Sequence, residues 1–281
     1  IPVYDLIIED GAVRGVITDK RSYRSDCVIL AMGGTSYPLT GSTGDGYRIA
    51  EKAGHTIIPV RPALVPLKID TRLAESLAGL ELKNINCRLY VDGKRKRQEF
   101  GECSFISSGI SGPVILTMSL MAVDALREGK AVGLSLDLKP ALDDVKLDAR
   151  LLRDLEGRAK EPMASVLRGV LPRALVEVCL QRCSIDGRET AGNLPAKSRK
   201  RLRTWLKDFR IEITGHGTFD EAIVTAGGVK TAEVDPHTME SRVVNCLYIT
   251  GELLDLQADT GGYNLQAAFS TGWVAGTMAA Q

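Results

Sequence analysis

The sequence has almost no excess of charge of either sign. Lysine and arginine together number 36 and aspartate and glutamate 35, so the formal net charge of the 281 residues is +1. A chain so evenly balanced has no overall field to attract a polyanion, which argues against nucleic acid as its partner. A long apolar run is also missing, because residues 113–123 are interrupted by Thr117 and Ser119 and are too few to span a bilayer. No membrane partner is therefore expected.

Disulfide and metal motifs are missing as well. The six cysteines are scattered without a CxxC pair, which argues against a disulfide framework or a structural zinc site. His55, His216 and His237 lie far apart without metal-ligand spacing, so we expect them in loops or in contact with solvent. There is no signal peptide and no Asn-x-Ser/Thr site. These absences predict a reduced, cytoplasmic protein without a bound metal.

The first part of the chain has the pattern of an α/β protein. Residues 3–8 and 13–18 are β-rich runs, and Asp10-Gly11 between them predicts a tight hairpin turn. Residues 27–31 are apolar on both faces, as expected for a central strand of a covered parallel sheet. A short helix is expected after this strand.

The middle of the chain differs from its two ends. From about residue 62 short β runs predict a small barrel or sandwich. Between residues 143 and 209 three apolar stripes at helical spacing predict a small bundle. A strand at 209–213, another at 246–250 and a helix from Asn264 onward complete the order.

This order predicts an α/β domain that is interrupted by a β region, which in turn carries a helical insert. The predicted boundaries are 1–61 and 223–281 for the two parts of the α/β domain. The β region is expected at 62–138 and 209–222, and the helical insert at 139–208. No internal repeat is present.

Three glycine-rich turns are candidates for contact with a ligand. Gly33-Gly34 follows the apolar strand, residues 41–46 (GSTGDG) open a helix, and residues 260–264 (TGGYN) precede the last helix. Glycine lets a backbone approach a ligand closely, and a helix N-terminus favours an anion or a polarised oxygen. Each turn also fits plain turn chemistry. Their place after strands of one sheet favours ligand binding, because ligands bind at the carboxyl ends of such strands.

Glu252 follows Gly251 directly after a predicted strand, and two interpretations are open for it. Its carboxylate could accept hydrogen bonds from ligand hydroxyls. It could equally be a helix N-cap or a surface charge.

Two basic runs stand out against the even charge balance. Residues 94–97 (KRKR) lie at a predicted turn, and residues 197–210 carry seven basic residues and one acid, Asp208. A solvated amphipathic helix explains the second run without a ligand. A surface for a partner or for RNA is the alternative.

A family resemblance is carried by blocks that span nearly the whole chain. In chain order they are residues 31–38 (AMGGTSYP), 41–47 (GSTGDGY), 62–67 (PALVPL), 109–113 (GISGP), 224–229 (VTAGGV), 238–241 (TMES), 251–255 (GELLD) and 260–266 (TGGYNLQ). Together they resemble the BaiN/RdsA-type (YhiN-like) family of NAD(P)/FAD-dependent oxidoreductases, also called aminoacetone-oxidase-family FAD-binding enzymes.

The resemblance implies a partial FAD/NAD(P)-binding Rossmann-like domain with an inserted β-barrel that carries a helical bundle. It also implies FAD as cofactor, NAD(P)H as reductant and a small organic molecule as substrate. The residues implied to contact FAD are Gly33 and Gly34 on the adenosine or pyrophosphate side, and Gly227, Gly228, Gly251, Glu252, Gly261, Gly262, Tyr263 and Asn264 at the ribityl and flavin end. A helix N-terminus aimed at the flavin would stabilise the negative charge of its reduced form. No side chain is assigned as a general acid or base.

One departure from the family separates two hypotheses. The family begins with a strand, a GxGxxG turn and a helix, and Ile1 corresponds to a position on the order of a hundred residues into the family's chain, as judged from usual domain sizes. The first hypothesis is therefore that the chain is most of a flavoprotein oxidoreductase and is inactive on its own. The second is a truncated, non-catalytic binding module that acts through the barrel and the basic insert. Self-association through an exposed sheet edge is also expected.

Overall fold

The computed structural model describes residues 1–281, which form two compact units. Unit 1 comprises residues 1–65 and 217–281, and unit 2 comprises residues 66–216. Along the chain, unit 2 is therefore an insertion into unit 1. The finer division into four segments, with the β region starting at residue 62, stays a prediction.

Unit 1 begins with the predicted hairpin. Strands β1 (Val3–Glu9), β2 (Ala12–Thr18) and β3 (Ser22–Arg24) form an antiparallel sheet in that order. Asp10 and Gly11 form its first turn with φ angles of 52° and 76°, in the left-handed region that such turns require. The short-range turn signal therefore predicted this part of the fold.

Unit 1 contains one parallel strand pair, and the covered central strand expected at residues 27–31 is only partly buried, since Ile29 is 38% exposed. β4 (Val28–Leu30) pairs in parallel with β14 (Leu247–Ile249), which follows far along the chain. β5 (Ile57–Ala63) and β13 (Val224–Val229) form a separate antiparallel pair. Helix α1 (Asp45–Lys52) packs its buried residues Tyr47 and Ile49 into the same core as Leu30 and Ile249. This arrangement agrees with the predicted α/β class.

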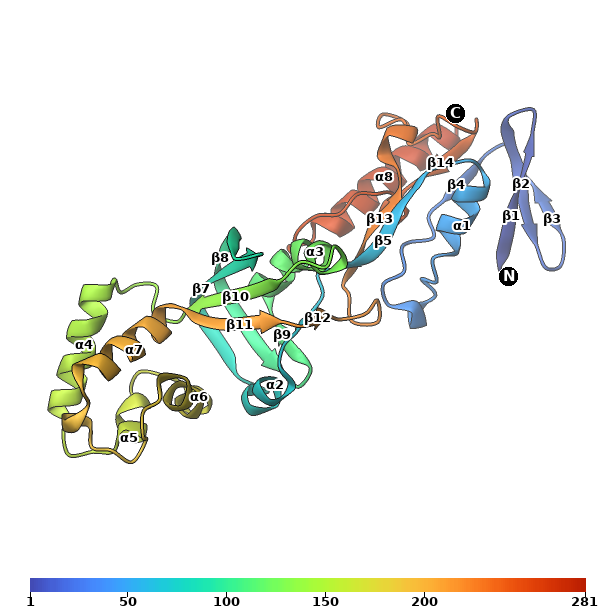
Figure 1. The fold of residues 1–281 in the computed structure, drawn as a ribbon. Coiled ribbons are helices and arrows are strands. Elements are labelled where there is room, and N and C mark those ends of the chain that lie inside the picture. Colours follow the sequence, from blue (N-terminus) through green and yellow to red (C-terminus); the bar gives the residue numbers. More distant parts are fainter. The chain divides into compact units, whose positions relative to one another are not determined.

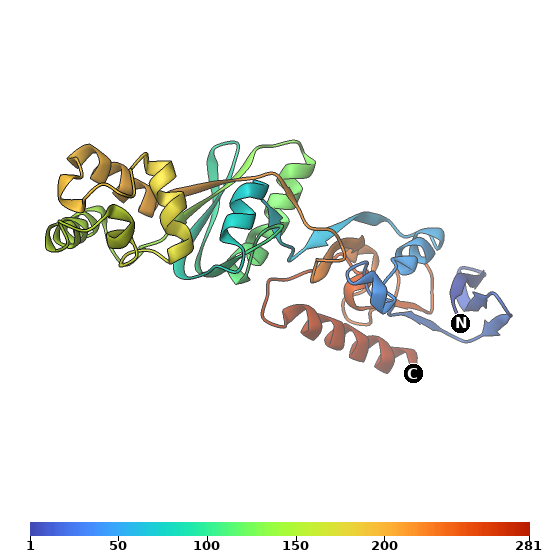
Figure 2. The ribbon, with the colours of Figure 1, turned by 90° about the horizontal axis from the view of Figure 1, so that it is seen from below.

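Helix α8 (Tyr263–Ala279) closes the chain and buries only one residue, Ala275. Leu265, Phe269 and Trp273 are 64%, 70% and 78% exposed. The helix runs along the outside of unit 1 (Figures 1 and 2). Neither α8, the longest helix, nor any other helix has the length and apolar character needed to cross a membrane.

Unit 2 contains one antiparallel sheet with two helices packed on it. Its strands are β6 (Leu67–Lys68), β7 (Glu81–Val91), β8 (Lys94–Ile106), β9 (Gly109–Ser111), β10 (Val132–Asp137), β11 (Phe209–Ile213) and β12 (Gly215–His216), and its helices α2 (Thr71–Leu77) and α3 (Pro113–Arg127). The strand order is β11-β10-β7-β8-β9-β6-β12. The structure does not show the closed barrel that we expected. Its two end strands are separated only by Thr214, so the sheet curls strongly without a ladder between its ends.

Between β10 and β11 the chain is helical, as the apolar stripes indicated. The helices are α4 (Asp144–Gly157), α5 (Met163–Leu167), α6 (Arg173–Cys183) and α7 (Ala196–Lys207), and they lie together at one end of unit 2 (Figure 1). Leu151, Leu175 and Leu202 belong to the same buried core as the sheet. Cys179 and Cys183 are buried in α6, and all six cysteines of the chain are free.

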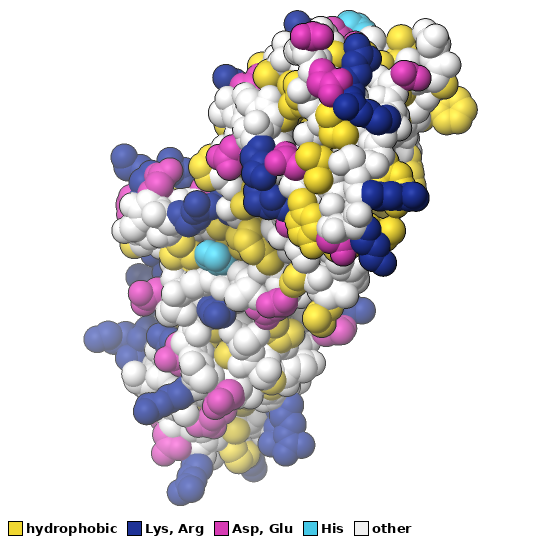
Figure 3. All heavy atoms as spheres, turned by 90° about the vertical axis from the view of Figure 1, so that its right-hand side faces the viewer, with side chains coloured by type: hydrophobic (Ala, Val, Ile, Leu, Met, Phe, Trp, Pro, Cys, Tyr) yellow, Lys and Arg dark blue, Asp and Glu magenta, His cyan; other side chains and the backbone are white.

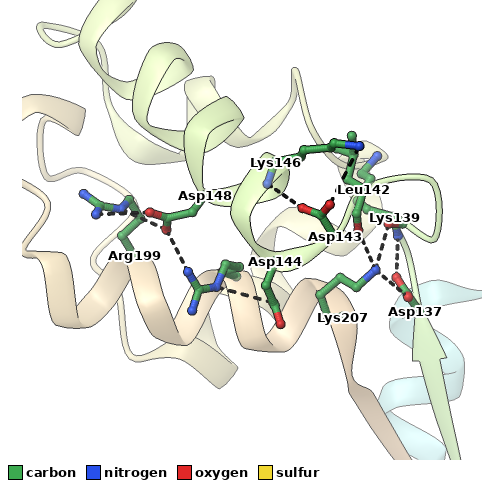
Figure 4. A network of polar contacts seen from close by, with 10 residues as sticks. Asp137, Lys139, Leu142, Asp143, Asp144, Lys146, Asp148, Arg199 and Lys207 are labelled. Carbon is green, nitrogen blue, oxygen red and sulfur yellow. Dashed lines mark hydrogen bonds and ion pairs between the residues drawn. The ribbon is translucent and has the colours of Figure 1, made fainter.

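Two of the six basic residues of helix α7 face acids of α4. Arg199 Nε lies 3.2 Å from Asp148 Oδ1 (Figure 4). Arg203 Nη1 lies 3.4 Å from the same oxygen. Elsewhere the charge balance of the sequence holds on the surface, since Figure 3 shows basic and acidic side chains interspersed on the face it presents. The helix is amphipathic as expected, because Leu202, Trp205 and Leu206 are buried on its other face. The alternative of a partner or RNA surface stays a prediction.

Lys207, at the end of α7, joins the helical part to the sheet. Its Nζ lies 2.6 Å from Asp137 Oδ2 at the end of β10 and donates hydrogen bonds to the carbonyls of Lys139 and Leu142 (Figure 4). Asp137 is 2% exposed, and its second cation is Arg88, at 3.6 Å. Removing one partner of a buried ion pair strongly destabilises a protein, because the charge that remains is left without an opposite charge.

We expect Asp137→Ala to lower the free energy of unfolding by about 3 kcal/mol, because it leaves the partly buried ammonium of Lys207 unpaired. Urea unfolding followed by tryptophan fluorescence measures this. The control is Asp144→Ala, which removes an exposed carboxylate 3.5 Å from Arg203 and is expected to cost less than about 1 kcal/mol. Equal costs for the two variants would contradict the role given to Asp137.

Candidate functional site

The loop after β4 is held against β13 by one threonine. Thr225 Oγ1 accepts hydrogen bonds from the backbone N–H groups of Thr35, at 2.9 Å, and Ser36, at 3.1 Å. Thr225 is 1% exposed, so its hydroxyl is committed to these contacts. The glycine turn at Gly33-Gly34, which directly precedes Thr35, is thereby fixed beside β13.

Glu252 lies in the short helix η4 (Gly251–Leu253) after β14, and its carboxylate lies beside Thr225 and Gly34. Its Oε1 accepts a hydrogen bond from the Thr225 N–H at 2.5 Å. A Cβ atom on Gly34 would lie 2.6 Å from this oxygen and 2.5 Å from Thr225 Oγ1. Gly34 is therefore required by the protein's own packing. Glu252 is neither a helix N-cap nor a free surface charge.

Tyr47 of α1 holds η4 from the other side. Its Oη donates a hydrogen bond to the carbonyl of Glu252 at 3.1 Å. Burial and then the negative charge of Glu252 raise the pKa of Tyr47 well above its ordinary value, so the phenol stays protonated and keeps donating. Neither Tyr47 nor Thr225 was predicted as a site residue. Thr225 belongs to the block 224–229 that carries the family resemblance, but nothing in that block assigned a role to its hydroxyl.

The N-terminus of α8 lies at a cavity of about 360 Å³. The cavity is lined by Gly251, Glu252, Gly261, Gly262 and Asn264, together with Leu64, Ile223, Val224, Leu256, Asp259, Thr260, Leu265, Ala267 and Ala268. Gly262 is the N-cap residue of α8, and no side chain caps the helix. The first N–H groups of the helix are thus without a side-chain acceptor, and the positive end of its dipole lies at the cavity.

Asn264 has a structural task in this arrangement. Its Oδ1 accepts a hydrogen bond from the Ala258 N–H, and its Nδ2 donates one to the Ala258 carbonyl, both at 2.8 Å. These bonds tie the loop before α8 into a fixed turn. Tyr263 is 64% exposed, and it is not among the residues that line the cavity.

Gly227 and Gly228 lie in β13, whose residues are all buried. A Cβ atom on Gly227 would lie 2.5 Å from the Pro59 carbonyl oxygen, and one on Gly228 2.6 Å from that of Leu253. Their φ angles of 85° and 130° also favour glycine. Contact between backbones explains both residues, and their predicted contact with FAD stays a prediction.

The predicted site residues thus fall into three groups. Gly251, Glu252, Gly261, Gly262 and Asn264 line one cavity. Gly33 and Gly34 do not line it, although Gly34 packs against the carboxylate of Glu252. Gly227, Gly228 and Tyr263 lie outside its wall.

His55 lies in the loop between α1 and β5, as one of the two predicted alternatives has it, but it is shielded from solvent, with 3% of its surface exposed. Its Nε2 lies 2.8 Å from Ser241 Oγ and its Nδ1 3.3 Å from Glu233 Oε2. Burial lowers the pKa of His55 below 6.5, although Glu233 opposes the shift.

Comparisons with known proteins agree with this fold. The family described as "HI0933-like protein Rossmann domain" matches residues 2–278. The chain is 34% identical over 263 residues to the 3-dehydro-bile acid delta(4,6)-reductase of Clostridium scindens. The matched segment covers 94% of this chain and 64% of that protein. It is 31% identical to the ribosomal RNA dihydrouridine synthase of Escherichia coli, over 88% of this chain and 58% of that protein. It is 28% identical to the enzyme of the same name from Haemophilus influenzae, over 95% of this chain and 64% of that protein.

The fold and these matches define the class as Rossmann-like α/β. The chain belongs to the HI0933-like family, and the resemblance to BaiN/RdsA-type oxidoreductases is confirmed. It spans less than two thirds of the length of these three relatives.

We expect Gly34→Ala to disrupt the contact between the loop after β4, Thr225 and Glu252, because its Cβ overlaps two side-chain oxygens. A loss of about 2 kcal/mol in the free energy of unfolding is typical of such overpacking. The matched control is Gly272→Ala, where nothing lies within 4 Å and helix propensity favours alanine. Denaturant unfolding should rank Gly34→Ala below the wild type and Gly272→Ala at or above it. The opposite order would contradict the packing described for Gly34.

The buried His55 predicts a pH dependence of stability. A histidine whose pKa is lower in the folded than in the unfolded chain makes the unfolded chain bind more protons, so stability falls as the pH drops below 6.5. Urea unfolding between pH about 7.5 and about 5.5 should show this loss, above the range in which carboxylates titrate. His55→Gln should flatten the profile, whereas the exposed control His237→Gln should leave it unchanged. An unchanged profile in His55→Gln would assign the dependence to another group.

Proposed function

We propose that the chain is the flavin-binding part of an oxidoreductase and that unit 1 binds FAD at the cavity in front of α8. The observation that carries the proposal is the uncapped N-terminus of α8 at a cavity partly lined by glycine backbone. Backbone N–H groups at a helix N-terminus bind electron-rich oxygens, and the helix dipole stabilises negative charge there. Both properties suit the pyrimidine end of a flavin, which gains charge on reduction.

The rest of the cavity wall supports the same cofactor. Glu252 Oε1 is held by the Thr225 N–H, which leaves the second carboxylate oxygen to accept a hydrogen bond from a ribityl hydroxyl. Leu64, Ile223 and Leu256 supply an apolar wall for a planar ring and exclude water from it. When bound, FAD supplies the hydride chemistry, and the protein contributes binding, orientation and electrostatics.

NADH or NADPH is the proposed electron donor, and an unsaturated organic molecule the proposed acceptor. The relatives are named for reduction of a bile-acid derivative at delta(4,6) and for synthesis of dihydrouridine in ribosomal RNA. Both names describe the addition of hydrogen to a carbon–carbon double bond, and we extend that class of acceptor to this chain. The family match over residues 2–278 does not favour the alternative of a non-catalytic binding module. Self-association stays a prediction.

A titration of the full chain with FAD, followed by flavin fluorescence, tests the proposal. We expect saturable binding of FAD. Gly262→Asp places a negative charge at the N-cap of α8 and should weaken FAD binding about tenfold. Gly262→Asn is the matched control, because it has the same size, tolerates the left-handed backbone of Gly262 and adds no charge.

Two results would contradict the proposal. If the wild-type chain fails to bind FAD, the binding-module hypothesis is favoured instead. Equal losses of affinity in Gly262→Asp and Gly262→Asn would show that the electrostatic end of α8 does not contact the cofactor.

A further inference from the structure

A second cavity, in unit 2, has a chemistry of its own. It is a groove of about 790 Å³, and its polar and aromatic lining consists of Lys83, Asn84, Asn86, Phe100, Lys139 and Arg150. These residues come from β7, β8, the segment after β10 and α4. None of them takes part in the cavity proposed for FAD.

The groove is positively charged, because three cations and no acid line it. Lys139 is half-buried, and burial followed by the charge of Arg150 lowers the pKa of its ammonium group. Asp137, two residues earlier, accepts a hydrogen bond from the backbone N–H of Lys139, while its other oxygen faces Lys207. Arg150 has a single acid nearby, Asp154 at 3.6 Å. An anion in the groove would relieve the repulsion between Lys139 and Arg150.

An aromatic ring lies beside these cations. Phe100 is 63% exposed in β8, where a phenylalanine normally turns inward. It pairs directly with Asn86 of β7, so its ring and an amide lie on neighbouring strands. Exposed aromatic rings stack planar bases, and amides offer both a donor and an acceptor to the edge of a base.

A backbone irregularity presents two further side chains to the groove. The register of β7 against β8 shifts between Leu82 and Ile85, which marks a bulge at Lys83 and Asn84. Asn84 has a φ angle of 53°, in the left-handed region that is costly within a strand. Bulges re-aim side chains and are frequent beside functional sites. Here the bulged residues both line the groove.

We propose that this groove binds a nucleotide unit, with the phosphate at Lys139 and Arg150 and the base stacked on Phe100. Asn84 and Asn86 then contact the edge of the base. The same chemistry is offered by a free mononucleotide and by one unit of a single strand of nucleic acid. The even charge of the whole chain does not oppose this, since the positive charge is local to the groove.

The test uses the full chain with two probes, a short fluorescein-labelled oligoadenylate and unlabelled AMP. Fluorescence anisotropy measures binding of the oligonucleotide, isothermal titration calorimetry measures binding of AMP, and competition shows whether the two share a site. Binding of either probe that weakens with added salt is expected. If AMP displaces the oligonucleotide, a free nucleotide suffices as ligand; if only the oligonucleotide binds, the strand is the source. Failure of both probes to bind would overturn the proposal.

Variants assign the binding to the groove. Phe100→Ser should raise the Kd about tenfold, and Phe100→Tyr, which keeps the ring, should restore it. The double variant Lys139→Gln with Arg150→Gln should also raise the Kd about tenfold and reduce its salt dependence. Lys200→Gln, an exposed cation of α7 outside the groove, is the control and should leave the Kd unchanged.

Urea unfolding of each variant, followed by the fluorescence of Trp205 in unit 2, shows whether the groove variants are folded. This control does not depend on the flavin site proposed for unit 1. Unchanged nucleotide binding in Phe100→Ser and in the double variant would overturn the proposal.

Discussion

Unit 1 depends on stretches of backbone that approach one another more closely than a Cβ atom allows. Gly227 and Gly228 bring β13 against β5 and η4, and Gly34 brings the loop after β4 against the same strand. Once these segments are in contact, the Thr225 N–H can reach the carboxylate of Glu252. The wall of the cavity in front of α8 is therefore a consequence of backbone packing elsewhere in the unit.

Patterns that span a few neighbouring residues predicted individual turns and helices. They could not predict contacts between residues that are distant in the sequence. The hairpin at Asp10-Gly11 and the helices between β10 and β11 followed from local spacing. The pattern at Gly227 and Gly228 indicated that something approaches the backbone closely. It could not indicate whether this is a ligand or a neighbouring strand, because both exclude a Cβ atom at these positions. The role of the Thr225 hydroxyl and N–H could not be predicted, because their partners, Thr35 and Glu252, are distant in sequence.

Charge shows the same limit of one-dimensional patterns. The basic run in α7 allowed either a solvated helix or a surface for a partner, and its spacing did not indicate that Arg199 and Lys207 face acids of neighbouring elements. Lys139 belongs to no basic run and nevertheless lies beside Arg150 without a carboxylate at its ammonium group. Three-dimensional pairing, which composition does not encode, decides where uncompensated charge remains.

Unit 2 starts and ends on neighbouring strands. β6 and β12 pair with Leu67 opposite His216, and a Cβ atom on Gly217 would lie 2.8 Å from Val65 Cγ2. Because the two ends of the insertion already meet, joining them directly would add little loop-closure entropy to unit 1. Residues 66–216 can therefore change in length without moving the strands of unit 1 apart.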